Sequence, residues 1–183
     1  MGSNASSRSA LASAAVATDP AGLSLSEHRG ARLYHLEGAR DRAPLATVLG
    51  LPALPAIGHC AGTPDAQVLA IGPDIFMLVT QSPAPDLAQA FAAVVDVSDG
   101  WTRIVVTGSH ARDLLAQGCA LDLHPQVFPP GTCAVTGFAG LRTFVWHAAE
   151  DRFGLLVGRS YARALWDWLL ESAAEFGVFA PAR

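Results

Sequence analysis

Residues 132–158 read TCAVTGFAGLRTFVWHAAEDRFGLLVG, and this stretch decides the fold that we expect. It is rich in β-branched and aromatic residues, which favour strands. Two short breaks, at Ala139-Gly140 and Ala149-Glu-Asp151, divide it into three predicted strands. The strands are expected at 132–138, 141–147 and 152–158.

A long helix is predicted directly after these strands. Ser160 is its expected N-cap, and Gly177 is its expected C′ residue. Between them an apolar stripe follows one face of the helix through Leu165, Trp168, Leu169 and Phe176. The second half of the chain therefore forms a hairpin followed by a helix.

The same pattern occurs earlier, more weakly. Residues 69–79 run through a Gly72-Pro-Asp74 turn, and the apolar spacing of residues 83–93 predicts a helix after it. Two hairpin-plus-helix units without regular strand-helix alternation predict an α+β fold. We expect antiparallel sheet with helices packed on one face.

The segments around these units extend the prediction. A strand is expected at 32–37, and strands at 94–98 and 101–107 are expected to pair through a two-residue hairpin turn at Asp99-Gly100. Ser109 should cap a helix that ends near residue 118. Its inward-facing residues should be Ala111, Leu114 and Leu115.

Composition bounds the number of domains. We expect residues 1–19 to be a disordered tail, partly a remnant of cloning, and residues 20–183 to form a single domain. Apolar residues make up 51% of the chain and charged residues only 15%. That balance is typical either of an alanine-rich monomer or of a subunit with one covered face.

Charge and cysteine content exclude several partners. All twelve basic residues are arginine, they are interleaved with acids, and the net charge is −4, so nucleic acid is not an expected partner. No apolar run is long enough to span a bilayer. The three cysteines are far apart in the sequence, which favours a reducing compartment.

Motifs for catalysis or cofactor binding are absent from the sequence. Neither G-x-G-x-x-G nor G-x-x-x-x-G-K-[ST] occurs, and the six histidines lack metal-ligand spacing. We therefore expect no catalytic, cofactor-binding or metal-binding residue in this chain. Ser109, His110 and Asp113 have the residue types of a hydrolase triad, but a helix cap accounts for Ser109 more simply.

Two features are typical of docking surfaces. Trp166 and Leu170 are i, i+4 neighbours that lie away from the apolar stripe of the last helix, so they belong either to a broad core or to a partner groove. Three prolines exclude helix and central strand for residues 121–131, which must form an ordered loop or an extended arm. This segment either contacts a partner or folds back on its own core. The predicted interface residues are Trp166, Leu170, His124, Val127, Phe128 and Pro129.

Three blocks of sequence carry a resemblance to a known family. They are VDVSDGWTRIVVTG (95–108), ARDLLAQGCALDLHP (111–125) and FPPG (128–131). Together they resemble the gamma-subunit family of heterotetrameric sarcosine oxidases, and the likeness extends over about residues 22–178. One departure follows the Gly72-Pro-Asp74 turn, where this chain has Ile75-Phe76 and the family tends to have Glu-Trp.

The resemblance implies a fold similar to the aminomethyltransferase, folate-binding family. It also implies assembly with alpha, beta and delta subunits in a bacterial cytoplasm, in a complex that oxidatively demethylates sarcosine to glycine with O2 and tetrahydrofolate. FAD, FMN, NAD and tetrahydrofolate are then associated with alpha and beta, and zinc with delta. No catalytic residue is carried over to this chain. A stand-alone folate-binding or aminomethyl-transfer module is the alternative, and a hydrolase is the third.

Overall fold

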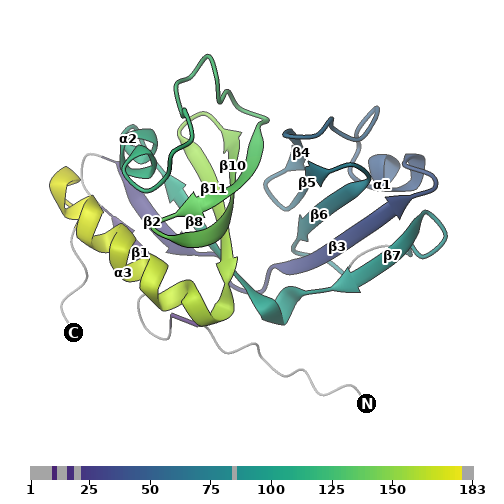
Figure 1. The fold of residues 1–183 in the computed structure, drawn as a ribbon, viewed down its shortest axis with the longest axis horizontal. Coiled ribbons are helices and arrows are strands. Elements are labelled where there is room, and N and C mark those ends of the chain that lie inside the picture. Colours follow the sequence, from purple (N-terminus) through teal and green to yellow (C-terminus); the bar gives the residue numbers. More distant parts are fainter. Residues whose placement is uncertain (1–9, 12–15, 19–21, 84–85, 179–183) are drawn as a thin grey trace.

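The computed structural model describes residues 10–11, 16–18, 22–83 and 86–178. Within these ranges the strands form two antiparallel sheets that lie side by side (Figure 1). The six-stranded sheet has, in spatial order, β1 (Val16–Thr18), β2 (Ser24–Glu27), β8 (Trp101–Thr107), β11 (Arg152–Gly158), β10 (Leu141–Ala149) and β9 (Cys133–Phe138). The five-stranded sheet has β4 (Cys60–Thr63), β5 (Ala66–Gly72), β6 (Ile75–Thr80), β3 (Arg32–Ala39) and β7 (Phe91–Asp96).

Helices and sheets make four layers. Helices α2 (Ala111–Ala116) and α3 (Ala162–Ala173) pack on one face of the six-stranded sheet, and α1 (Ala43–Val48) packs on the far face of the other sheet. An apolar cluster fills each of the three gaps. Strand alternation explains how one strand serves two clusters: Leu155 and Val157 face the helices, and Leu156 faces the other sheet.

The three strands predicted within residues 132–158 are confirmed. Val145 of β10 pairs with Ala134 of β9 on one side and with Leu155 of β11 on the other. The α+β class with antiparallel sheet is likewise confirmed, and α3 follows β11 as expected. The final 3₁₀ turn, Ala174–Phe176, ends at Gly177, whose φ of 83° is the left-handed conformation predicted for that glycine.

The predicted hairpin at Asp99-Gly100 is wrong, although both of its strands exist. β7 pairs with β3 in one sheet, and β8 pairs with β2 and β11 in the other. A 3₁₀ turn at Ser98–Gly100 connects them, and Asp96 Oδ1 accepts hydrogen bonds from Ser98 N at 2.9 Å and Ser98 Oγ at 2.5 Å. Ser98 Oγ in turn accepts from Leu33 N at 2.9 Å. These local bonds hold the turn against β3, so the chain crosses between sheets.

The helix predicted over residues 83–93 is also wrong. Residues 84–85 lie outside the described ranges, a turn occupies 88–90, and β7 begins at Phe91. Phe91 pairs with Ala39 across β3, and its ring packs edge-on against Phe76 with centroids 6.0 Å apart. Both hairpins of the predicted units are present, but only the second is followed by a helix, because pairing with an open sheet edge outweighs a short apolar pattern.

Neither serine predicted as an N-cap fills that position. The N-cap residues of α2 and α3 are His110 and Tyr161, and neither makes a side-chain capping bond. Ser160 lies instead in the 3₁₀ turn Arg159–Tyr161. Ala111, Leu114 and Leu115 are buried as predicted. No helix in the described part of the chain combines the length and apolar character needed to cross a bilayer.

Regular structure begins before residue 20. Leu11 is buried in the cluster beneath α2 and α3, and β1 pairs with β2. The predicted disordered tail of residues 1–19 therefore does not extend over these positions. The rest of that predicted tail lies outside the described residues.

Candidate functional site

The proline-rich loop at 121–131 is anchored to the domain by one arginine. Arg112 Nη1, from α2, donates to the carbonyl of Leu123 and, at 3.3 Å, to the carbonyl of Phe128. Its guanidinium also lies over the Phe153 ring, 5.2 Å from the centroid. Two carbonyls of the loop are thus satisfied by a single side chain, which fixes the loop's course.

His147 of β10 provides a second anchor at the same carbonyl. Its Nδ1 lies 3.0 Å from Phe128 O, and since a carbonyl can only accept, Nδ1 carries the proton. The 3.5 Å approach of Arg112 Nη2 to this nitrogen is then a contact between two donors. The imidazole is fully buried and stacks on Phe153 at 4.3 Å with an interplanar angle of 5°.

The loop presents some of the predicted interface residues and buries another. His124 and Pro129 are exposed, and Val127 is 57% exposed. Phe128 is only 6% exposed and belongs to the core cluster under α2, so its assignment to the surface is corrected. Both anchors hold the carbonyl of Phe128, and its ring packs in the core cluster. The loop is therefore an ordered element with Val127 at its surface.

The predicted surface role of Trp166 is also corrected. This side chain is 1% exposed and packs in the cluster between α3 and the six-stranded sheet. Leu170 is half-buried against the same cluster. Helix α3 has a broad core face, the first of the two alternatives that its sequence left open. The indole Nε1 of Trp166 is buried without a hydrogen-bond partner among the described residues.

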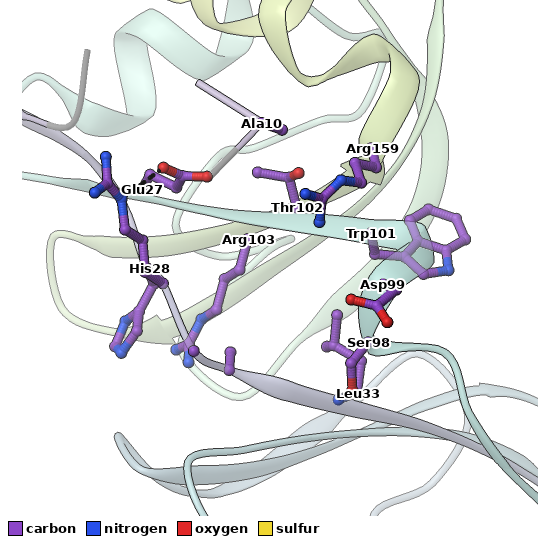
Figure 2. A pocket seen from close by; sticks show the side chains of 13 residues that line it. Ala10, Glu27, His28, Leu33, Ser98, Asp99, Trp101, Thr102, Arg103 and Arg159 are labelled. Atoms are coloured by element: carbon purple, nitrogen blue, oxygen red, sulfur yellow. Dashed lines mark hydrogen bonds and ion pairs between the residues drawn. The ribbon is translucent and has the colours of Figure 1, made fainter. Parts of the chain in front are cut away.

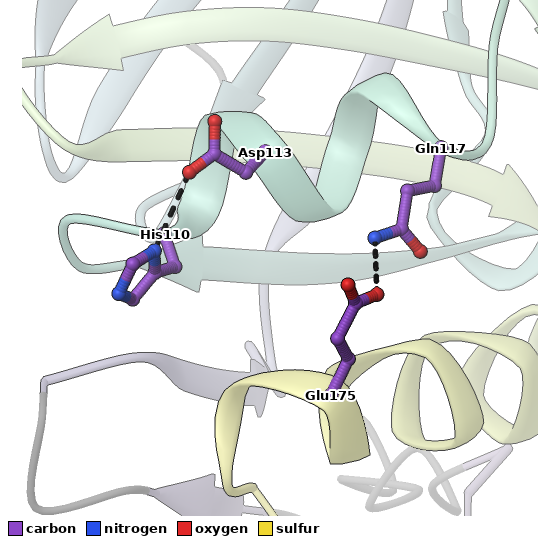
Figure 3. Close-up of polar contacts among 4 residues, drawn as sticks. All are labelled: His110, Asp113, Gln117 and Glu175. Carbon is purple, nitrogen blue, oxygen red and sulfur yellow. Dashed lines mark hydrogen bonds and ion pairs between the residues drawn. The ribbon is translucent and has the colours of Figure 1, made fainter.

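The serine, histidine and aspartate near α2 do not form a triad in the described residues. His110 Nδ1 lies 3.3 Å from Asp113 Oδ2. The His110 ring stacks on Phe176, in the 3₁₀ turn that follows α3, with ring centroids 5.1 Å apart. No hydrogen bond joins Ser109 to His110 in this part of the chain. Figure 3 shows the second contact that joins α2 to the C-terminal end of the α3 region, from Gln117 Nε2 to Glu175 Oε2 at 2.9 Å. This cluster connects helices.

Two cysteines lie where the sheets meet. Cys60 N donates to Gly131 O, and Cys133 N donates to Gly58 O, around a bridge between His59 and Thr132. Burial raises the pKa of Cys60 to about 12 and that of Cys133 to about 11. Both thiols are therefore protonated near neutral pH, which makes them poor nucleophiles. In the described ranges no three His, Cys, Asp or Glu side chains gather as a metal site.

A polar cavity opens beside the crossing between the two sheets. It has a volume of about 60 Å³, and Figure 2 shows its lining side chains converging from β2, β8, the Ser98–Gly100 turn and the start of the α3 region. Glu27, which lines it, accepts a hydrogen bond from Arg29 Nε at 3.0 Å. Asp99, Thr102 and Arg159 complete much of the wall.

Arg103 is the unusual residue of this cavity. It lies on the face of β8 that is turned toward the other sheet and is only 4% exposed. Its guanidinium lies over the Trp146 ring at 5.6 Å, and its Nε and Nη1 are buried without a hydrogen-bond partner among the described residues. Burial, and then the charge of Arg152, lower the pKa of Arg103 to about 10, against an opposing effect from Asp65.

Sequence reasoning missed Arg103 as a site residue. The available signal was a single charge inside WTRIVVT, at a position that alternation places on a buried face of a strand. Recognising it required knowing that both faces of β8 are covered, which depends on the second sheet.

Comparisons with known proteins identify the family of this chain. The sequence model described as the sarcosine oxidase, gamma subunit family matches residues 58–175, well over half of the chain. The chain belongs to the sarcosine oxidase gamma subunit family. Within that family, the gamma subunit from Corynebacterium sp. (strain U-96) is 30% identical over 156 residues, which covers 80% of this chain and 75% of the relative. The predicted resemblance is confirmed.

Solved structures place the family's fold in context. A chain of the heterotetrameric sarcosine oxidase from Corynebacterium sp. U-96, in complex with pyrrole 2-carboxylate, matches with a TM-score of 0.79 and 25% identity, covering 96% of this chain and 98% of that one. Aminomethyltransferase T of the glycine cleavage system from Bartonella henselae matches with a TM-score of 0.60 and 22% identity, covering 85% of this chain and 46% of that chain. The latter likeness concerns the fold alone and confirms the predicted aminomethyltransferase-like architecture.

Proposed function

We propose that this chain is a non-catalytic structural subunit of a heterotetrameric sarcosine oxidase that demethylates sarcosine to glycine. The observation that carries the proposal is the match over 96% of the chain to one chain of such an assembly. The low content of charged residues, 15%, supports a covered face. The alpha, beta and delta subunits are its proposed partners, in the cytoplasm.

The proposed contact surface includes the outer side of the 121–131 loop. His124, Val127 and Pro129 are exposed there, on a backbone held by Arg112 and His147. A loop that is already ordered loses little conformational entropy on binding, so its apolar residues contribute most of their buried area to affinity. Leu170, half-buried on α3, is proposed to lie at a second contact with a partner subunit.

Co-expression tests the proposal. The tagged chain is produced together with candidate alpha, beta and delta chains of a sarcosine oxidase, and a stable complex is expected to co-purify. Val127→Asp should weaken that complex at least tenfold, because a carboxylate cannot be desolvated in an apolar contact. Val48→Asp is the matched control, since Val48 on α1 is 56% exposed. Failure of the chain to form a complex with any of these candidate chains would refute the subunit role.

The proposed division of cofactors gives a second readout. FAD, FMN, NAD and tetrahydrofolate are assigned to alpha and beta, and zinc to delta, so the purified chain should be colourless and inactive toward sarcosine. The assembled complex should show flavin absorption. Calorimetric titration of the single chain with tetrahydrofolate distinguishes the alternative, because saturable heat would identify a folate-binding module.

A further inference from the structure

We propose that the cavity at Arg103 is a binding site for one carboxylate-class anion, either a small free carboxylate or an acidic side chain of a partner subunit. The guanidinium of Arg103 lacks an acceptor at part of its N–H groups within the described residues. Two of its nitrogens, Nε and Nη1, are buried without an acceptor among the described residues. A buried charge without a counter-ion is strongly unfavourable, so the arrangement calls for an anion.

Among the described residues, no acid forms an ion pair with Arg103, although Glu27 and Asp99 both line the cavity. Glu27 lines the cavity, but its carboxylate is bound by Arg29 Nε at 3.0 Å. Asp65 is the acid whose charge acts on Arg103, and it is exposed and makes no hydrogen bond to the guanidinium among the described residues. The guanidinium carbon of Arg103 lies over the Trp146 ring at 5.6 Å, and the Nε and Nη1 groups, which have no acceptor among the described residues, remain able to donate to an anion.

The size and lining of the cavity select the class of ligand. A volume of about 60 Å³ exceeds the ~10–15 Å³ that a single water needs, so the cavity has room for one carboxylate group. Figure 2 shows Arg103 and the ring of His28 on the same side of the cavity, while Thr102 and Arg159 form another wall. A guanidinium binds a carboxylate through charge-assisted hydrogen bonds. Water molecules in the cavity could accept the same hydrogen bonds, but they would not neutralise the positive charge of Arg103.

Formate is the probe for the test. Thermal unfolding of the full chain is followed against formate concentration, with sodium chloride at matched ionic strength as the control. At ten times the dissociation constant, formate should raise the Tm by about 3–6 °C more than chloride. A response no greater than that of chloride would mean that water fills the cavity, and the proposal would be overturned.

Variants connect the response to Arg103. Arg103→Met keeps an apolar stem over Trp146 and removes the charge, so formate should bind at least tenfold more weakly. Arg163→Met is the matched control, because Arg163 is an exposed arginine paired with Asp167 on α3 and should leave the formate response unchanged. An unaltered response in Arg103→Met would overturn the assignment. If that variant does not fold, the Nε–H resonance of Arg103 in the unmodified chain provides the test, since formate should shift it and chloride should not.

The assembled complex distinguishes the two sources of the carboxylate. If a partner subunit inserts an acidic side chain, formate should stabilise the isolated chain but not the complex, because the site is then occupied. If the ligand is a free anion, both preparations should respond. Loss of the formate response in both would contradict the proposal, whereas failure of the complex to assemble bears only on the proposed subunit function.

Discussion

Trp146 Nε1 donates a hydrogen bond to Gln67 Oε1 at 2.8 Å, and this bond joins the two sheets. Trp146 lies on β10 of the six-stranded sheet, and Gln67 lies on β5 of the five-stranded sheet. The indole is fully buried, and Gln67 is 5% exposed. A polar bond in a largely apolar gap fixes how the sheets are placed against each other, because sliding would leave both groups unpaired.

Trp146→Phe should therefore destabilise the fold by more than its loss of volume. The substitution removes the donor and leaves Gln67 Oε1 buried without a partner, at a cost of about 1–3 kcal/mol. Urea unfolding followed by circular dichroism measures the change in the free energy of unfolding. Trp168→Phe is the control, since Trp168 is half-buried and packs edge-on against Phe138. Equal losses in the two variants would show that the inter-sheet bond contributes nothing.

Gly154→Ala tests the packing on the other side of the same indole. Gly154 pairs with Trp146 across β11 and β10, and a Cβ at position 154 would lie 2.1 Å from Trp146 Cζ2. The ring must shift, which should cost about 1–3 kcal/mol. Gly137→Ala on β9 is the matched control, because its added Cβ meets nothing within 4 Å. A Gly154 variant as stable as the Gly137 variant would contradict this account of the core.

Arg112→Met should loosen the 121–131 loop. The carbonyls of Leu123 and Phe128 each lose a charged donor, and hydrogen bonds of that kind contribute about 1.5–3 kcal/mol. Amide hydrogen exchange across the loop should become faster, and association with partner chains should weaken. Arg163→Met serves as the control for loss of an arginine. Unchanged exchange in the loop would mean that His147 alone holds it.

Cysteine alkylation should report the buried junction between the sheets. Because burial raises the pKa of Cys133 to about 11 and that of Cys60 to about 12, their thiolate fractions at pH 8 are at least about 100-fold below that of an ordinary thiol. Iodoacetamide should modify them at least about 100-fold more slowly in the folded chain than in urea. Peptide mass spectrometry measures each site. Rapid modification of either residue under native conditions would contradict the buried geometry.

The stability of the chain should fall in mild acid in a manner that depends on His28. Burial, and then the charges of Arg103 and Arg152, lower the pKa of His28 below 6.5. The unfolded chain therefore binds a proton at higher pH than the folded chain does, and stability is lost as pH falls below about 6.5. His28→Gln should reduce the difference in urea midpoint between pH 7.5 and pH 5.5. An unchanged difference would exclude this histidine as its source.

Much of the local structure could be predicted from residue patterns. The strands around β9, β10 and β11 follow from β-branched and aromatic runs with short turns, and the apolar stripe of α3 identified its buried face. Phe91 shows why other segments could not be predicted: its spacing fits a helix face, but pairing with Ala39 in β3 supplies the backbone with better partners. The predicted cap positions were each one residue too early, since α2 and α3 begin after His110 and Tyr161.

The sequence by itself determined the α+β class, the family and the composition of the core, because these depend on residue type and periodicity along the chain. Only the tertiary structure decided that β7 and β8 belong to different sheets, that Trp166 and Phe128 face inward, and that two nitrogens of Arg103 are buried without an acceptor among the described residues. Each of these depends on which surfaces face each other, either between the two sheets or between the helices and the six-stranded sheet. Whether a side chain is buried and whether its charge is paired depend on residues that are distant in the sequence, so the local spacing of residue types does not predict them.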